Sequence, residues 1–169
     1  ISDKLGADPD RVVTFHSLSK RSNLPGLRSG FAASGEKNIK QMKQLRAYSG
    51  APIPEPLQHV SASVWDDEDH VIQNREIYKK KYKFADKIFD GFDGYLSPEA
   101  GFFLWLDVDN GEKTALELWQ ACGVRVLPGK YLAKDLNGQS PGDRFIRVAM
   151  VSELEETKDG LKKIREFLN

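Results

Sequence analysis

The sequence predicts an α/β protein, and three patterns along its 169 residues lead to that prediction. Short runs of β-branched and aromatic residues, as in residues 11–15, are typical of strands. Apolar residues spaced three or four apart, as in residues 35–48, are typical of helices. After residue 101, strand-like and helix-like segments alternate, which indicates an α+β arrangement in the C-terminal part of the chain.

The charges balance, because 25 Lys and Arg stand against 25 Asp and Glu, giving a formal net charge of zero. A protein that binds nucleic acid needs an excess of basic residues, so we expect no nucleic-acid partner. Three Trp, nine Phe and five Tyr supply core material and argue against disorder. No apolar run is long enough to cross a bilayer, so no membrane partner is expected. The single cysteine excludes an internal disulfide and indicates a reducing, cytoplasmic compartment.

Two strands are expected near the N-terminal end. Residues 11–15 are predicted to form a short buried strand and residues 27–33 a second strand. The segment between them is short and rich in turn residues. This favours antiparallel neighbours, since a parallel crossover needs a dozen or more residues. Residues 35–48 are then expected to form a helix.

A break is expected at residues 49–56, where three prolines within five residues exclude a regular element. A helix through residues 57–64 follows. The acidic cluster at residues 66–69 suits a helix N-terminus, where carboxylates meet the positive end of the helix dipole. From there a long helix is predicted to about residue 90, with the basic run at residues 79–81 on a solvated face.

The C-terminal part is predicted to contain further strands and two helices. The expected strands cover residues 101–108, 124–127 and 144–151. A helix over residues 114–121 is expected to end at Gly123, because glycine favours the left-handed conformation that terminates helices. Ser152, with Glu155 three residues later, predicts a capping box at the start of the last helix.

Lys20 is the first candidate for chemistry, because it lies on a turn just beyond a predicted strand. Ser17 and Ser19 flank it, and Arg28 lies at the start of the return strand. If the two strands are adjacent, an amine, hydroxyl groups and a guanidinium converge, as the binding of a phosphorylated carbonyl cofactor requires. Arginine binds phosphate oxygens bidentately, and an amine of lowered pKa forms a Schiff base with an aldehyde. From spacing alone, Lys20 and Arg28 are equally well explained as ordinary surface cations.

Residues 17–31, SLSKRSNLPGLRSGF, closely resemble the cofactor-attachment segment of class I and II aminotransferases, which use pyridoxal 5'-phosphate. The pattern Ser-x-x-Lys with an arginine eight residues after the lysine is long and specific. The resemblance implies that Lys20 binds the cofactor covalently as a Schiff base and moves the substrate proton. It also implies that Ser17 and Arg28 bind the cofactor phosphate, with Ser19 as a further contact.

Later stretches resemble the same family in the same order, so the resemblance covers nearly the whole chain. These stretches are residues 97–105, 123–131 and 144–150. The last is similar to the strand with the arginine that binds the substrate α-carboxylate, and Arg147 is the matching position. In an alternating strand, Arg147 shares a face with Phe145, whereas Arg144 lies on the other face. An ion-paired residue at a sheet edge is the alternative explanation of Arg147.

The resemblance implies the fold type I architecture of pyridoxal-phosphate enzymes, here two strands of the large-domain sheet followed by an α+β small domain. Residues 1–68 are then the end of the large cofactor-binding domain. Residues 69–169 are the small domain, entered by a helix at about residues 67–90. In this family the phosphate loop, the ring-stacking aromatic residue and the pyridine-nitrogen aspartate lie upstream of the lysine. The chain starts at Ile1 without Met, so we expect it to be the C-terminal portion of a longer enzyme, inactive on its own.

The implied reaction transfers an amino group between an amino acid, with glutamate as donor, and a keto acid, in a homodimer. Residues 20–26 and 46–52 resemble succinyldiaminopimelate aminotransferases. That resemblance implies N-succinyl-2-amino-6-ketopimelate, in lysine and diaminopimelate synthesis, as the acceptor. Two alternatives stay open, a catalytically silent truncated domain and a pyridoxal-phosphate-dependent lyase of the same fold. No metal is expected, because the three histidines lack metal-ligand spacing: His16, His59 and His70.

Overall fold

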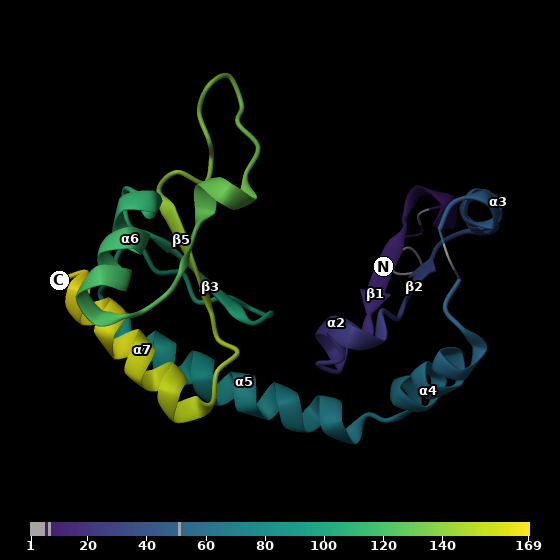
Figure 1. The fold of residues 1–169 in the computed structure, drawn as a ribbon, viewed down its shortest axis with the longest axis horizontal. Helices are drawn as coiled ribbons and strands as arrows, with labels where there is room; N and C mark the ends of the chain where they lie inside the picture. Colours follow the sequence, from purple (N-terminus) through teal and green to yellow (C-terminus); the bar gives the residue numbers. More distant parts are fainter. Residues whose placement is uncertain (1–5, 7, 51) are drawn as a thin grey trace. The chain divides into compact units, whose positions relative to one another are not determined.

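The chain divides into two compact units, Ile1–Gln73 and Asn74–Asn169, in a computed structural model that describes residues 6, 8–50 and 52–169 (Figure 1). Both units combine helices with a small antiparallel sheet, which confirms the predicted α/β class. The boundary between the units falls inside a long helix, α5 (Asp69–Ile88). No helix within the described ranges is long and apolar enough to cross a membrane.

Unit 1 contains a two-stranded ribbon of β1 (Thr14–Ser17) and β2 (Gly30–Ala33). The strands pair antiparallel, as the short connection predicted. Both begin later than predicted, because residues before them form 3-10 turns, η1 (Pro9–Arg11) and η2 (Pro25–Leu27). Each turn starts with a proline, whose fixed φ suits the first position of a helical turn.

The prediction of a buried strand at residues 11–15 is wrong, because β1 is largely exposed. The side chain of Phe15 is 72% exposed and that of Phe31, on the paired strand, is 47% exposed. Trp65 packs on the Phe31 ring, with ring centroids 5.0 Å apart. Phe15 lacks such cover in the part of the chain that the structure describes. A β-rich sequence therefore indicated the strand correctly but not its burial, which depends on a second layer.

The helices of unit 1 are α2 (Leu18–Arg21), α3 (Glu36–Tyr48) and α4 (Glu55–Asp66). Two of them, α3 and α4, follow the predicted order, whereas α2 is a short helix where a turn was predicted. Helix α3 confirms the helix expected at residues 35–48. Helix α4 begins inside the predicted break, because Pro56 occupies its first turn, where the missing N–H of proline has no helical partner to lose.

Helix α5 confirms the long helix that the acidic cluster predicted. At its start, the Asp67 carboxylate accepts a hydrogen bond of 2.9 Å from the Asp69 N–H, which satisfies an otherwise unpaired helical donor. Val71 and Ala85 are buried along this helix. The helix lies within unit 1 up to Gln73 and within unit 2 beyond it.

The predicted solvated face at residues 79–81 needs a correction at Lys81, whose residue is only 4% exposed. Its Nζ donates hydrogen bonds to the carbonyl oxygens of Met150 (2.7 Å) and Ser152 (2.5 Å). Burial lowers the pKa of Lys81, because desolvation disfavours the charged amine. Lys79 and Lys80 are exposed, as predicted.

The sheet of unit 2 has the order β3-β5-β4, and both pairings are antiparallel. Its strands are β3 (Phe103–Asp107), β4 (Leu127–Pro128) and β5 (Phe145–Ala149). The other elements are α6 (Gly111–Cys122), the 3-10 turn η3 (Gly129–Leu132) and α7 (Leu154–Phe167). Side chains from α5, β3, β5, α6 and α7, and from the residues that directly follow α5 and β5, form one core. It includes Ala85, Phe89, Leu104, Leu106, Leu118, Ile146, Met150, Leu161 and Ile164.

One of the two predicted helix ends in unit 2 is correct. Gly123 ends α6 in the left-handed conformation, with φ of 70°, and its N–H donates to the Trp119 carbonyl at 3.1 Å. The capping box at Ser152 is wrong, because Glu153 is the N-cap of α7 and no side chain caps that helix. The Ser152 backbone carbonyl instead accepts a bond of 3.0 Å from the Thr157 hydroxyl, besides the bond from the buried lysine.

Candidate functional site

The segment around Lys20 is a single helical turn placed directly after β1. Ser17 ends the strand and is the N-cap of α2, where its Oγ accepts a hydrogen bond of 3.1 Å from the Ser19 N–H. Leu18 is fully buried and anchors the turn, whereas Lys20 is exposed. The capping serine and the buried leucine therefore fix the turn, and the lysine projects from it.

The return strand lies against this turn through Ser29. The Ser29 carbonyl accepts hydrogen bonds from the Leu18 N–H (3.1 Å) and from the Ser17 hydroxyl (3.4 Å). Ser17 also lies opposite Gly30 in the strand register. A Cβ at Gly30 would lie 2.6 Å from the His16 carbonyl oxygen, so this close approach of the strands requires glycine.

Arg28 holds an unusual backbone conformation immediately before Ser29. Its φ of 54° and ψ of 31° lie in the left-handed region, which a long side chain rarely adopts. Its Nη1 donates to the Pro25 carbonyl at 2.8 Å, and a guanidinium has further N–H donors for other acceptors. Strained conformations of this kind cost about 1–3 kcal/mol and cluster at ligand-binding sites.

Arg147 lies in β5, the central strand of the unit 2 sheet, opposite Trp105 on one side and Leu127 on the other. Its guanidinium lies 4.3 Å from the centre of the Phe103 ring, a cation–π contact. Its Nε is buried and has no hydrogen-bond partner within the described residues. A buried unpaired donor costs free energy, so this atom is chemically suited to an anionic acceptor.

The predicted alternation along β5 is confirmed. Ile146 and Val148 are buried in the core, whereas Arg147 is only half-buried. Arg144, on the other side of the motif, is exposed and its Nε lies 3.1 Å from the Asp107 carboxylate. The hydrogen bond from Arg144 holds the pKa of Asp107 below its ordinary value, against the opposing effect of desolvation. The two arginines therefore have different surroundings, although only three positions separate them.

Four of the five predicted site residues lie in unit 1: Ser17 at the end of β1, Ser19 and Lys20 in the turn that follows it, and Arg28 two residues before β2. Arg147 lies in unit 2. No cluster of His, Cys, Asp and Glu in the described ranges could hold a metal ion.

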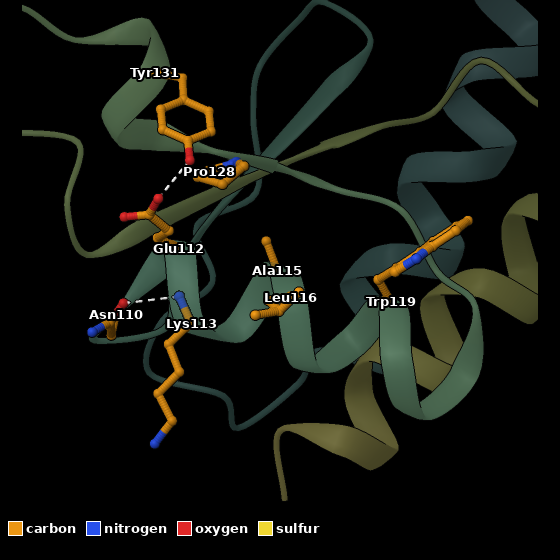
Figure 2. A pocket seen from close by; sticks show the side chains of 8 residues that line it. All are labelled: Asn110, Glu112, Lys113, Ala115, Leu116, Trp119, Pro128 and Tyr131. Carbon is orange, nitrogen blue, oxygen red and sulfur yellow. Dashed lines mark hydrogen bonds between the residues drawn. The ribbon is translucent and has the colours of Figure 1, made fainter.

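A separate hollow of about 670 Å³ lies on unit 2 (Figure 2). Figure 2 shows that α6 supplies most of its lining, with Leu116 and Trp119 facing it and the Tyr131 hydroxyl donating to Glu112. None of the five predicted site residues lines this hollow. It is therefore not the site that the sequence predicted.

The family model described as aminotransferase class I and II matches residues 2–164. The chain belongs to this family. A solved aminotransferase from Neisseria meningitidis is 35% identical to it, with a TM-score of 0.92, over 99% of this chain and 43% of that one. Together with the two-unit α/β architecture, this likeness confirms the predicted fragment of the fold type I architecture.

Two curated relatives with different substrates are similar to the chain. The chain is 27% identical to the 4-dedimethylamino-4-oxo-anhydrotetracycline transaminase OxyQ of Streptomyces rimosus, over 87% of this chain and 40% of that protein. It is 26% identical to the LL-diaminopimelate aminotransferase of Dehalococcoides mccartyi, over 92% of this chain and 40% of that protein. The chain thus spans about two fifths of the length of these relatives.

Pyridoxal 5'-phosphate is the cofactor of this family, and the donors around Lys20 suit it chemically. The Lys20 amine can form a Schiff base with the aldehyde of the cofactor, and Arg28 and the two serines can donate hydrogen bonds to its phosphate. The bond that the Ser17 hydroxyl donates to the Ser29 carbonyl is long, 3.4 Å, so the hydroxyl proton can turn to a better acceptor while its oxygen still accepts from the Ser19 N–H. The residues present therefore fit the group.

Proposed function

We propose that this chain is the C-terminal portion of a pyridoxal-phosphate-dependent aminotransferase, with Lys20 as the cofactor-binding lysine. The observation that supports the proposal most strongly is that the turn with Ser19 and Lys20, capped by Ser17, follows β1 directly and is hydrogen-bonded to Ser29, the neighbour of Arg28 in sequence. Membership of the aminotransferase family supports a role of these residues in binding pyridoxal 5'-phosphate. In this proposal, residues 1–68 belong to the large domain and residues 69–169 to the small domain.

Each residue has a distinct part in the proposed reaction. The Lys20 amine binds the cofactor and, once freed by the incoming amino acid, moves the proton to and from the substrate Cα. Ser17, Ser19 and Arg28 hold the phosphate and so fix the cofactor relative to the lysine. Arg147 binds the substrate α-carboxylate and orients the Cα–H bond. When bound, the cofactor supplies the electron sink that stabilises the developing carbanion.

The proposed substrates are glutamate as amino donor and a keto acid as acceptor, with N-succinyl-2-amino-6-ketopimelate as the specific acceptor. The similarity to an LL-diaminopimelate aminotransferase supports an acceptor of diaminopimelate synthesis, as do the residues at 20–26 and 46–52. We further propose a cytoplasmic homodimer. On its own, the 169-residue chain is expected to be inactive, because the pyridine nitrogen would lack its aspartate partner.

The role of Lys20 is tested by Lys20→Ala in the full-length protein. We expect turnover to be lost while the cofactor still binds noncovalently, because the phosphate contacts remain. Lys37→Ala, a change at an exposed lysine of α3, is the matched control and should leave the rate unchanged. A Lys20→Ala protein that keeps a near-normal rate would contradict the proposal.

The reaction type is tested by a screen of amino donors with 2-oxoglutarate. An aminotransferase converts the acceptor to glutamate in step with the donor that is consumed. Consumption of an amino acid without any glutamate formed would point instead to a lyase of the same fold. The donor with the highest kcat/KM then identifies the substrate.

A further inference from the structure

The C-terminal end of α2 is held by Arg21, the residue next to Lys20. Its side chain is only 6% exposed. The guanidinium donates to the carbonyl oxygens of Val64 (2.9 Å) and Trp65 (3.1 Å), in the last turn of α4, and to that of Asp67 (3.2 Å). The last carbonyls of a helix lack helical partners, so a cation is favoured at this end. The carboxylate of Glu68 adds an ion pair.

A second connection runs from Ser22 to the start of α5. Nε2 of His70 lies 2.9 Å from the Ser22 hydroxyl, and Nδ1 of His70 lies 2.8 Å from the Asp67 carboxylate. The hydrogen bond from His70 holds the pKa of Asp67 below its ordinary value, so Asp67 is an acceptor here. Nδ1 is therefore the donor, and in the neutral ring Nε2 accepts the Ser22 proton.

The order Asp67, His70, Ser22 is the one that serine hydrolases use, but its surroundings assign it another role. Ser22 is only 7% exposed, so a substrate has little access to its hydroxyl. The Ser22 Oγ also lies 3.3 Å from Nη1 of Arg21, which donates to it and lowers its nucleophilicity. The hydrogen bonds thus connect Arg21 through Ser22 and His70 to Asp67.

We propose that Arg21, Ser22, His70 and Asp67 form a latch that positions Lys20 by fastening α2 to the connection between α4 and α5. The proposal rests on the proposed function, because it concerns the site that contains Lys20. These are positioning residues, since they act through the lysine and do not touch the substrate. The latch lies wholly within unit 1.

The need for such a latch follows from the length of α2, which has four residues. One isolated turn is not stable in water, because its nucleation fixes several dihedral angles for a single hydrogen bond. Ser17 and Leu18 hold its first half against the return strand. The latch holds its second half, so Lys20 lies between two fixed points.

The test uses His70→Ala and Ser22→Ala in the full-length holoenzyme. We expect kcat to fall about tenfold to a hundredfold, as a misplaced catalytic group requires, while KM for the amino donor stays within about twofold. Amide hydrogen exchange at residues 18–22 should become about tenfold faster, with the rest of unit 1 unchanged. His70→Gln, which keeps a hydrogen-bonding group toward Ser22, should restore most of the lost kcat.

The matched control is His59→Ala, at a histidine on α4 whose side chain is 79% exposed and whose Nε2 lies 3.7 Å from the Glu55 carboxylate. It should change neither kcat nor exchange. His70→Ala behaving like this control would overturn the latch. So would exchange that rises evenly over the whole unit, which would indicate a merely structural role. A wild-type holoenzyme without amino transfer would overturn the proposed function instead, while the exchange measurement would still decide the latch.

Discussion

At the scale of single residues, Arg147 combines two environments that a surface arginine does not have. Its charged group lies on the Phe103 ring, and its Nε is buried and has no hydrogen-bond partner among the residues that the structure describes. A guanidinium that has lost water without gaining a full set of acceptors binds an anion strongly, because part of the desolvation cost is already met. This supports the proposed contact with the substrate carboxylate.

Arg147→Lys in the full-length enzyme should therefore raise KM for the amino donor. A lysine keeps the charge but cannot bind a carboxylate bidentately. Loss of one charge-assisted hydrogen bond, about 1.5–3 kcal/mol, corresponds to an increase of about tenfold to a hundredfold. Steady-state kinetics with the preferred donor measures it.

The control is Arg144→Lys, at the exposed arginine that pairs with Asp107 and Asp109. Exposed ion pairs contribute little, so KM should stay within about twofold. Equal effects of the two substitutions would rule out the assignment of Arg147.

At the scale of elements, Lys81 fastens helix α5 to the end of β5. Its amine binds two carbonyls of the segment that follows the strand, and the Tyr78 ring lies 5.0 Å from the amine. The strand that contains Arg147 is thus fixed at its C-terminal end by the helix that runs through both units.

Lys81→Ala should weaken this attachment. We expect the opening free energy of β5 to fall by about 1.5–3 kcal/mol, because buried carbonyls lose a charged donor. Amide exchange of residues 145–149 in the full-length protein measures the change. Lys80→Ala, at the exposed neighbour, should stay within about 0.5 kcal/mol.

The stability difference between the wild type and Lys81→Ala should depend on pH, and the direction of that dependence follows from the pKa of Lys81. Burial lowers the pKa of Lys81 below 10.5 in the folded protein. Between the lowered pKa and 10.5, the unfolded chain holds a proton that the folded chain has released, so stability rises with pH. The advantage of the wild type over Lys81→Ala should therefore grow as the pH rises toward 10.5, and a shrinking advantage would contradict the burial of the amine.

Local patterns predicted most elements, because the helical spacing of α3, the acidic start of α5 and Gly123 act within a few residues. Local patterns failed to predict burial where the hydrogen-bond partners of a side chain lie far away in the sequence. The basic run gave no sign that Lys81 is buried, since its acceptors Met150 and Ser152 lie about seventy positions away in sequence. The expected capping box failed because α7 starts one residue later than predicted, with Glu153 at its N-cap.

In the candidate site, too, the local features could be predicted from the sequence and the long-range contacts could not. The motif around Lys20 was predictable, because strand, turn and return strand are consecutive in sequence. The latch was not, because His70 lies 48 positions beyond Ser22 and has no recognisable spacing to it. The sequence offered two separate signals, the polar pair Arg21 and Ser22 directly after the lysine and the acidic cluster at residues 66–69, and nothing in it connected them.

At the scale of the whole molecule, the chain spans about two fifths of the length of its curated relatives, and the five predicted site residues are divided between its two units. Unit 1 exposes Phe15 and part of Phe31. Unit 2 has its own core and contains Arg147. We propose that both units belong to a full-length enzyme whose cofactor is bound to Lys20.

Chemical reduction of the cofactor–lysine link tests that claim most directly. The full-length protein is loaded with pyridoxal 5'-phosphate, reduced with borohydride, digested and analysed by mass spectrometry. We predict one phosphopyridoxyl group, on Lys20, and none in Lys20→Ala. A label on another lysine, or none in the wild type, would contradict the account.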